Sequence, residues 1–277
     1  MTGQPEQPDL KVINQKKRSG FPEQPAVVQE TGWLRYTEPM NKSTMCHNAA
    51  AGSLKSLADS AYQRFFSRLT PDTQVLGIRM PALRQWVKSL SDQQRSAFLN
   101  DLPHVYTEEN QAHILLINEI TGFEQAAAAL RQFIPYADSW AVTDILNVRA
   151  FRQDSQTESL ALELLKQDNP WGVRLGMLIL KRHFLRTDPH LPAVLAACRD
   201  HETVSMMTAW YLAELTIHDP EAVLACVPQL EWATAKRLGQ KVRDSRRISP
   251  DIKNRVSAAT AATRNRLAQS EGTPETR

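Results

Sequence analysis

The fold is decided by the stretch PALRQWVKSLSDQQRSAF at residues 81–98, which holds two consecutive helix signals. Pro81 stands where proline opens a helix, and apolar residues recur at three- and four-residue spacing up to Leu90. Ser91 and Gln94 then form a capping-box pattern that starts a second helix. The stretch therefore predicts two helices joined by a very short turn, with no strand between them.

Comparable caps and apolar periods continue from about Leu54 to Leu267, and strands find almost no support along the way. Only 10 of the 277 residues are glycine, which disfavours folds built on many tight turns or Gly-rich phosphate loops. We expect an all-α fold of about twelve helices, each roughly 10 to 18 residues long. Helix pairs with a unit of roughly 35 to 40 residues further predict an α-solenoid, in which each pair buries its apolar face against its neighbours.

The two ends of the chain differ from this pattern. Residues 1–52 are polar and hold five prolines before position 40, so we expect a disordered leader, followed by the repeat domain at 53–268 and a disordered tail at 269–277. No run approaches the roughly 18 apolar residues of a membrane span, and the first 30 residues lack the apolar core of a secretory signal. We therefore expect a soluble, cytoplasmic protein, associated with the nucleoid if its source is bacterial.

Signals for metal or nucleophile chemistry are scarce. Cys46, Cys198 and Cys226 lie far apart, and no Cys-x-x-Cys spacing occurs, so neither a disulfide framework nor a zinc knuckle is indicated. The sequence also shows no metal-ligand cluster and no Cys/His nucleophile arrangement. We expect no metal and no cofactor.

Positive charge is concentrated near the C-terminus. Residues 236–277 hold 11 Lys+Arg and 4 Asp+Glu, a net charge of +7, against −4 for residues 1–235. A polyanion would bind at this basic end, although a solvated face with no partner is the alternative. The candidate phosphate-binding residues are Lys236, Lys241, Arg243, Arg246 and Arg247.

The most informative segment is YADSWAVTDILN, residues 136–147. If Ser139 caps a helix, a step of about 100° per residue separates a core arc from an opposite arc. The core arc holds Ala141, Val142, Ile145, Leu146 and Val148, and the opposite arc holds Trp140, Thr143, Asp144 and Asn147. The positions three and four residues from Asp144 offer no Lys or Arg, so another helix or a ligand must supply its partner. A rim tryptophan beside a routine surface ion pair is the alternative interpretation.

Two further apolar segments carry isolated polar or aromatic candidates. The first is NPWGVRLGMLILK, residues 169–181, in which Arg174 and Lys181 fall close to one line along the helix. There they can bind a phosphate or pair with acids of a neighbouring repeat. The segment around Trp210 is apolar nearly all round, so taken alone it predicts a central helix with a core tryptophan.

Five motifs in order resemble AlkD-like DNA alkylation repair proteins, over about residues 57–268. The motifs are GIRMPALR at 77–84, Ser139-Trp140 with Asp144, Trp171 with Arg174, MTAW at 207–210 with Glu214, and KVRDSRR at 241–247. The resemblance implies a stack of HEAT-like helix pairs whose concave surface holds duplex DNA. It also implies DNA glycosylase activity on N3- and N7-alkylated purines, without flipping of the lesion into a pocket.

The resemblance further implies roles for individual residues. Asp144 would be the catalytic residue facing the sugar of the damaged nucleotide, Trp140 and Trp210 would be the two cleft tryptophans, and Arg174 a cleft arginine. Alkylation at N3 or N7 makes the purine a cationic leaving group, so cleavage mainly needs stabilisation of an oxocarbenium-like sugar, which a carboxylate can supply. We expect a monomer whose partner is duplex DNA containing alkylated bases. A non-catalytic binder of branched or damaged DNA and a protein-binding α-solenoid are the alternatives.

Overall fold

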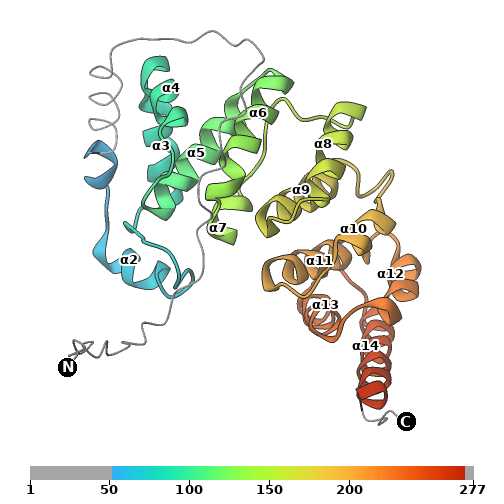
Figure 1. Ribbon diagram of the computed structural model, residues 1–277. Helices are drawn as coiled ribbons and strands as arrows, with labels where there is room; N and C mark the ends of the chain where they lie inside the picture. The colour runs from blue at the N-terminus through green and yellow to red at the C-terminus, as the bar shows by residue number, and fades with distance from the viewer. Residues whose placement is uncertain (1–51, 272–277) are drawn as a thin grey trace, which may run out of the picture. The chain divides into compact units, whose positions relative to one another are not determined.

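The computed structural model describes residues 52–271, which belong to one compact unit built of helices joined by turns and loops (Figure 1). The helices are α2 (Ser60–Phe66), α3 (Met80–Ser89), α4 (Asp92–Asn100), α5 (Thr107–Glu119), α6 (Phe123–Phe133), the 3-10 helix η1 (Ile134–Tyr136), α7 (Trp140–Thr143), α8 (Ser155–Leu165), α9 (Pro170–His183), α10 (Leu191–Ala197), α11 (Glu202–Leu215), α12 (Pro220–Cys226), the 3-10 helix η2 (Val227–Gln229), α13 (Trp232–Asp244) and α14 (Pro250–Glu271). Within the described residues no strand forms, and the all-α prediction is confirmed.

The helices are arranged as a succession of neighbours. Helix α3 contacts α5, and the contacts continue through α7, α9 and α11 to α13, while α4, α6, α8, α10 and α12 lie beside this row (Figure 1). One large apolar cluster runs from Ile114 of α5 to Val256 of α14, and a second, smaller cluster lies around α3 and α4. Each helix thus buries its face against the next, as expected for an α-solenoid.

The predicted helix starts are confirmed where local caps decide them. Pro81 lies in the first turn of α3, and Ser91 and Gln94 form both hydrogen bonds of the capping box of α4. The predicted lengths were less accurate, because α2, α10 and α12 have only seven residues and α14 has 22. Pro228 explains part of the difference, since α12 passes into a 3-10 turn at this proline.

The ends of the described part bear on the predicted boundaries. Helix α14 continues to Glu271, three residues past the expected end of the repeat domain. The expected leader, except for residue 52, and the last part of the expected tail, 272–277, lie outside the described residues. No described helix combines the length and the apolar character that crossing a bilayer requires.

Helix α5 is unusual because polar residues of its first turns are buried. The fully buried carboxylate of Glu108 accepts backbone N–H bonds from Leu76 at 2.9 Å, Gly77 at 2.7 Å and Ile78 at 3.0 Å. Gly77 has a φ of +90°, a conformation that glycine adopts readily. This carboxylate therefore fixes the turn that leads into α3.

Candidate functional site

A cleft of about 690 Å³ brings together the four residues predicted to face the substrate. Its walls come from the loop 69–73, the start of α7, the first half of α9, α11 and α13. The aromatic and charged residues that line it are Asp72, Asp138, Trp140, Asp144, Trp171, Arg174, Glu202, Trp210 and Lys241. Asp144, Trp140, Arg174 and Trp210 thus share one surface although they lie on three helices.

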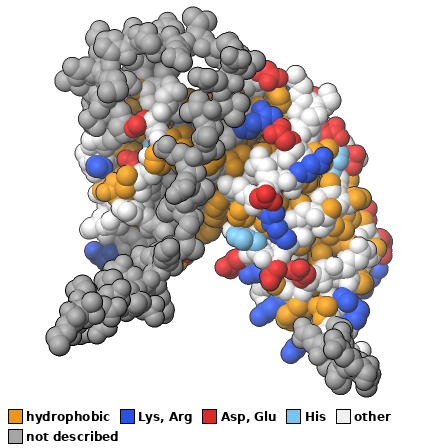
Figure 2. Space-filling model, in the orientation of Figure 1, with side chains coloured by type: hydrophobic (Ala, Val, Ile, Leu, Met, Phe, Trp, Pro, Cys, Tyr) orange, Lys and Arg blue, Asp and Glu red, His pale blue; other side chains and the backbone are white. Residues whose placement is uncertain are grey.

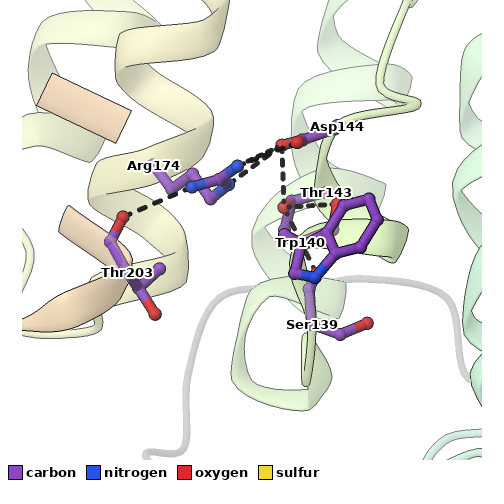
Figure 3. Close-up of polar contacts among 6 residues, drawn as sticks. All are labelled: Ser139, Trp140, Thr143, Asp144, Arg174 and Thr203. Atoms are coloured by element: carbon purple, nitrogen blue, oxygen red, sulfur yellow. Dashed lines mark hydrogen bonds and ion pairs between the residues drawn. The ribbon is translucent and has the colours of Figure 1, made fainter. Parts of the chain in front are cut away.

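Asp144 is held by a guanidinium from the neighbouring helix. Nε of Arg174 donates to Oδ1 of Asp144 at 2.9 Å, and Nη2 donates to Oδ2 at 2.8 Å (Figure 3). Arg174 also donates from Nη1 to the carbonyl of Thr203 at 3.3 Å, and its side chain is only 4% exposed. The side chain of Asp144 stays 23% exposed. A two-point pair of this kind fixes the orientation of the carboxylate while one side of it still faces the cleft.

The local structure around Asp144 corrects the sequence prediction. Helix α7 has four residues and Asp144 is its C-cap, so the expected helix through Asn147 does not form. Thr143, which was placed on the arc opposite the core, is fully buried. The chain leaves the helix because Asn118 of α5 accepts the N–H of Asn147 at 2.6 Å and donates to the carbonyl of Ile145 at 2.9 Å.

The tryptophans present different faces to the cleft. Trp140 is 46% exposed, which agrees with its predicted position off the core arc, while Trp171 and Trp210 are half-buried. The ammonium of Lys181 lies 3.7 Å from the centroid of the Trp210 ring, a cation–π contact. Burial lowers the pKa of Lys181, and Glu214 opposes this shift. Trp210 is therefore not a plain core residue, because a cation of α9 stacks against it.

Two polar side chains at the rim of α7 have unused hydrogen-bonding capacity. Asp138 Oδ2 accepts from Nδ2 of Asn110 at 2.9 Å, and burial raises the pKa of Asp138. Asp138 Oδ1 and Ser139 Oγ are buried and have no hydrogen-bond partner among the described residues. Ser139 is the N-cap residue of α7, as predicted, but its side chain makes no capping hydrogen bond. Sequence reasoning missed Asp138, which precedes the tryptophan motif directly.

The basic segment near the C-terminus divides into residues with different surroundings. Lys241 lines the cleft, and burial lowers its pKa, with Arg174 adding to the effect. Arg247 donates to both carboxylate oxygens of Glu214, at 2.5 and 2.6 Å. Arg243 donates to Oε1 of Gln240 at 2.8 Å. Lys241 is thus part of the cleft wall, whereas Arg247 is committed to an acid of α11.

Lys236, Arg243, Arg246 and Arg247 are all exposed, and within residues 52–271 Arg247 is the one of these four that forms an ion pair. On the face drawn in Figure 2, Lys and Arg side chains alternate with acidic and apolar ones and form no continuous basic area.

One group of described residues has the composition of a metal site, and it does not line the cleft. Glu158, Asp188 and His190 bring potential ligand atoms within 4.8 Å of one another. Nε2 of His190 lies 3.4 Å from Oε1 of Glu158 and 3.9 Å from Oδ2 of Asp188. These three residues can equally form an ion-paired cluster if the histidine is protonated, so they add nothing to the chemistry of the cleft.

Comparison with known proteins agrees with the motif order. The model of a family described as DNA alkylation repair enzyme matches residues 52–247, which is more than half of the chain and includes every residue named above as lining the cleft. Searches among curated proteins and among solved structures find no match. The match confirms the resemblance to DNA alkylation repair proteins, and the chain belongs to the family of DNA alkylation repair enzymes.

Proposed function

We propose that this DNA repair enzyme is a glycosylase, which hydrolyses the N-glycosidic bond of N3- or N7-alkylated purines in duplex DNA. The observation that carries the proposal is the carboxylate of Asp144, fixed by two guanidinium nitrogens at the wall of a cleft with three tryptophans. We further propose that the protein acts as a monomer on duplex DNA containing alkylated bases.

Asp144 would act on the sugar and on water. An alkylated purine leaves as a neutral base, because its positive charge is neutralised when the glycosidic bond breaks, and positive charge then develops on the sugar. A carboxylate stabilises that charge when it is held in place before the reaction. Each oxygen of Asp144 uses one lone pair for Arg174, and Oδ1 also accepts from Oγ1 of Thr143 at 3.4 Å. Because a carboxylate has about four acceptor sites, Oδ2 can still orient the attacking water, which donates a proton to the carboxylate as it adds to the sugar.

The other groups of the cleft would bind the nucleotide. The exposed indole of Trp140 offers a π face to a cationic base or sugar, and Trp171 and Trp210 lie in the same cleft. Lys241 places a positive charge where backbone phosphates would approach. This set needs no redox or metal chemistry for the hydrolysis, because the leaving group is already activated by alkylation.

The test is release of 7-methylguanine from methylated duplex DNA by wild type, Asp144→Asn and Asp72→Asn. Losing one preorganised electrostatic interaction costs about 10²–10³ in rate. We therefore expect Asp144→Asn to lower the single-turnover rate at least tenfold while duplex affinity stays level or rises. Asp72→Asn is the matched control, because Asp72 lines the same cleft and forms no ion pair within the described part of the chain. Equal rates for all three proteins would show that the catalytic role was assigned to the wrong carboxylate.

One observation favours the second candidate, a non-catalytic binder of damaged or branched DNA. Arg174 contacts both oxygens of Asp144, so the charge of the carboxylate is already balanced within the protein. Wild-type protein that binds methylated duplex DNA but releases no base would establish this alternative and reject the glycosylase. The protein-binding alternative gains nothing from these observations, because the family description concerns DNA repair.

A further inference from the structure

A second recess, of about 280 Å³, lies between the C-terminal half of α3, the end of α5 and the segment that follows α7. None of its lining residues lines the cleft. Three of them are cations, Arg84 and Lys88 of α3 and Arg149 beyond α7. Arg84 belongs to the motif at 77–84, to which the proposed chemistry assigns no role.

The charges of this recess are not balanced by the protein. Arg84, Lys88 and Arg149 are exposed, and none of them forms an ion pair within residues 52–271. The acid in the recess, Glu119, is paired with Arg95. Arg84 and Lys88 stand four residues apart on one helix face, a spacing at which like charges repel each other. An anion bound between them would remove this repulsion.

The floor of the recess is fixed by backbone hydrogen bonds. The side chain of Asn118 holds both Asn147 and Ile145, as described above, and the N–H of Arg149 donates to the carbonyl of Asn118 at 2.9 Å. The segment 144–149 therefore connects the catalytic candidate directly to a cation of the recess. A rigid floor beneath exposed cations suits a ligand that is bound through charge at a constant position.

We propose that this recess binds a backbone phosphate of the duplex, on the flank of the lesion. The inference rests on the proposed action on duplex DNA and adds a second anchoring point to it. Arginine suits phosphate because its planar guanidinium donates two parallel hydrogen bonds. Five residues separate Asp144 from Arg149, and an extended chain of that length spans about 17 Å at most. Because one helical turn of B-DNA is about 34 Å long, the bound phosphate lies within one turn of the lesion.

The experiment uses the full-length protein and a duplex that carries one 2′-fluoro-stabilised 7-methylguanine. Single uncharged methylphosphonates replace successive phosphates on either strand, and affinity is measured by fluorescence anisotropy at several salt concentrations. For the wild type we expect one or two positions within a turn of the lesion at which neutralisation weakens binding roughly tenfold. In the triple variant Arg84→Ala, Lys88→Ala, Arg149→Ala, neutralising the phosphate that the recess binds should no longer weaken binding, while any phosphate bound by Lys241 keeps its effect. The slope of log affinity against log salt should fall by about 0.9 for each phosphate that the variant no longer binds.

The control is a second triple variant, Arg64→Ala, Lys166→Ala, Arg186→Ala, which removes the same charge from exposed positions outside the recess and the cleft. It should keep the wild-type phosphate profile. Identical profiles for the wild type and the recess variant, or identical behaviour of the two triple variants, would overturn the proposal. A third result would also overturn it: inorganic phosphate raises the thermal stability of the wild type but not of the recess variant, while both give the same duplex profile. That result would assign the recess to a small anion. If the glycosylase proposal is wrong, the protein will bind the duplex without releasing base. The phosphate profile measures binding alone, so it tests the recess in either case.

Discussion

Two cations, Arg174 and Lys241, line the cleft and three line the recess, and most of the cations in and beside the cleft have partners that the recess cations lack. In and beside the cleft, Arg174 is bound to Asp144, Lys181 is stacked on Trp210 and Arg247 is paired with Glu214. In the recess, the cations of α3 and of the segment after α7 have no ion-pair partner among the described residues. The number of positive charges is thus a poor guide to their roles.

The difference separates cations that position other groups from cations that are free to bind an anion. A paired arginine has already exchanged its hydration for a carboxylate, so it gains little from a phosphate. When an unpaired, exposed cation binds a phosphate, counterions condensed on the DNA are released, and this release adds to the affinity. On this basis we expect substitutions of the partnered cations Arg174 and Lys181 to change the rate of base release. Substitutions of the recess cations, and of Lys241 in the cleft, should change affinity.

The largest effect is expected at Arg174. Arg174→Ala should lower the single-turnover rate of 7-methylguanine release at least about a hundredfold, because Asp144 loses both bonds that orient it. It should also destabilise the fold by about 3 kcal/mol, near the lower end for a broken buried pair, since Asp144 is partly exposed. Arg237→Ala, which breaks the hydrogen bonds from α13 to Ser205 and Glu202 of α11, is the matched control and should retain activity. A faster reaction in Arg174→Ala would mean that the pair restrains the carboxylate.

The next prediction concerns how the stability of the protein depends on pH, through a histidine of α5, one of the helices that line the recess. His113 of α5 is stacked on Phe133 and lies 3.0 Å from a nitrogen of His104, and burial, with His104 adding to it, lowers its pKa to about 3. The unfolded chain binds a proton at about pH 6.5 and the folded one does not, so stability is full above that pH and is lost as the pH falls toward 3. At pH 5 the protein should be about 2 kcal/mol less stable than at pH 8.

Chemical denaturation of wild type and His113→Gln at the two pH values checks this contribution. The pH dependence should shrink in the variant without vanishing, because burial lowers the pKa of His183 as well. An unchanged pH dependence would show that His113 is protonated in the folded protein.

An effect of intermediate size is expected at Lys181. Lys181→Met keeps the apolar stem and removes the charge above Trp210, a contact of about 0.5–2 kcal/mol. The rate of base release should fall by about 2- to 30-fold, and Lys181→Arg should restore most of it. Single-turnover kinetics at saturating enzyme measure the rate apart from binding. If only affinity changes, Lys181 belongs with the anion-binding cations. The assignment of rate effects to the cleft and affinity effects to the recess would then be wrong for this residue.

The smallest effect concerns the end of the basic segment. Arg246→Ala should weaken binding to every duplex and lower the salt slope by at most about 0.9, because the variant binds one phosphate fewer. Arg247→Ala should change the slope less, since Arg247 is bound to Glu214, and this exposed pair contributes at most about 1 kcal/mol to stability. Salt titrations of the two variants side by side provide the comparison, and equal slopes would contradict it.

The parts of the fold that local signals determine could be predicted from the sequence. Prolines and capping residues marked the starts of α3 and α4, because such caps act within a few residues. The end of α7 could not be predicted, since Asn118, almost thirty residues away, takes the N–H of Asn147. The absence of a local partner for Asp144 correctly indicated a partner elsewhere, but only the packing of α9 beside α7 identifies it as Arg174.

The recess shows a different limit of sequence reasoning. Arg84 and Lys88 are visible as a pair at helical spacing, while Arg149 joins them only through the contact between α5 and the segment after α7. The segment around 236–247 drew attention because its charges are consecutive. Three cations from two distant parts of the chain produce no such concentration in the sequence.

The turn fixed by Glu108 has a consequence for how substitutions at buried positions are interpreted. Glutamine at position 108 would have almost the shape of glutamate. Its amide nitrogen, however, would replace a carboxylate oxygen that accepts a backbone N–H in the wild type. The apparently conservative change would therefore leave a buried donor without an acceptor. A side chain at Gly77 would meet the carbonyl oxygen of Asp59. We therefore expect saturation mutagenesis to find these two sites as intolerant as Asp144, although neither lines the cleft or the recess. Intolerance at a position thus does not distinguish a residue that shapes the scaffold from one that takes part in the reaction, and folded yield must be measured beside repair activity.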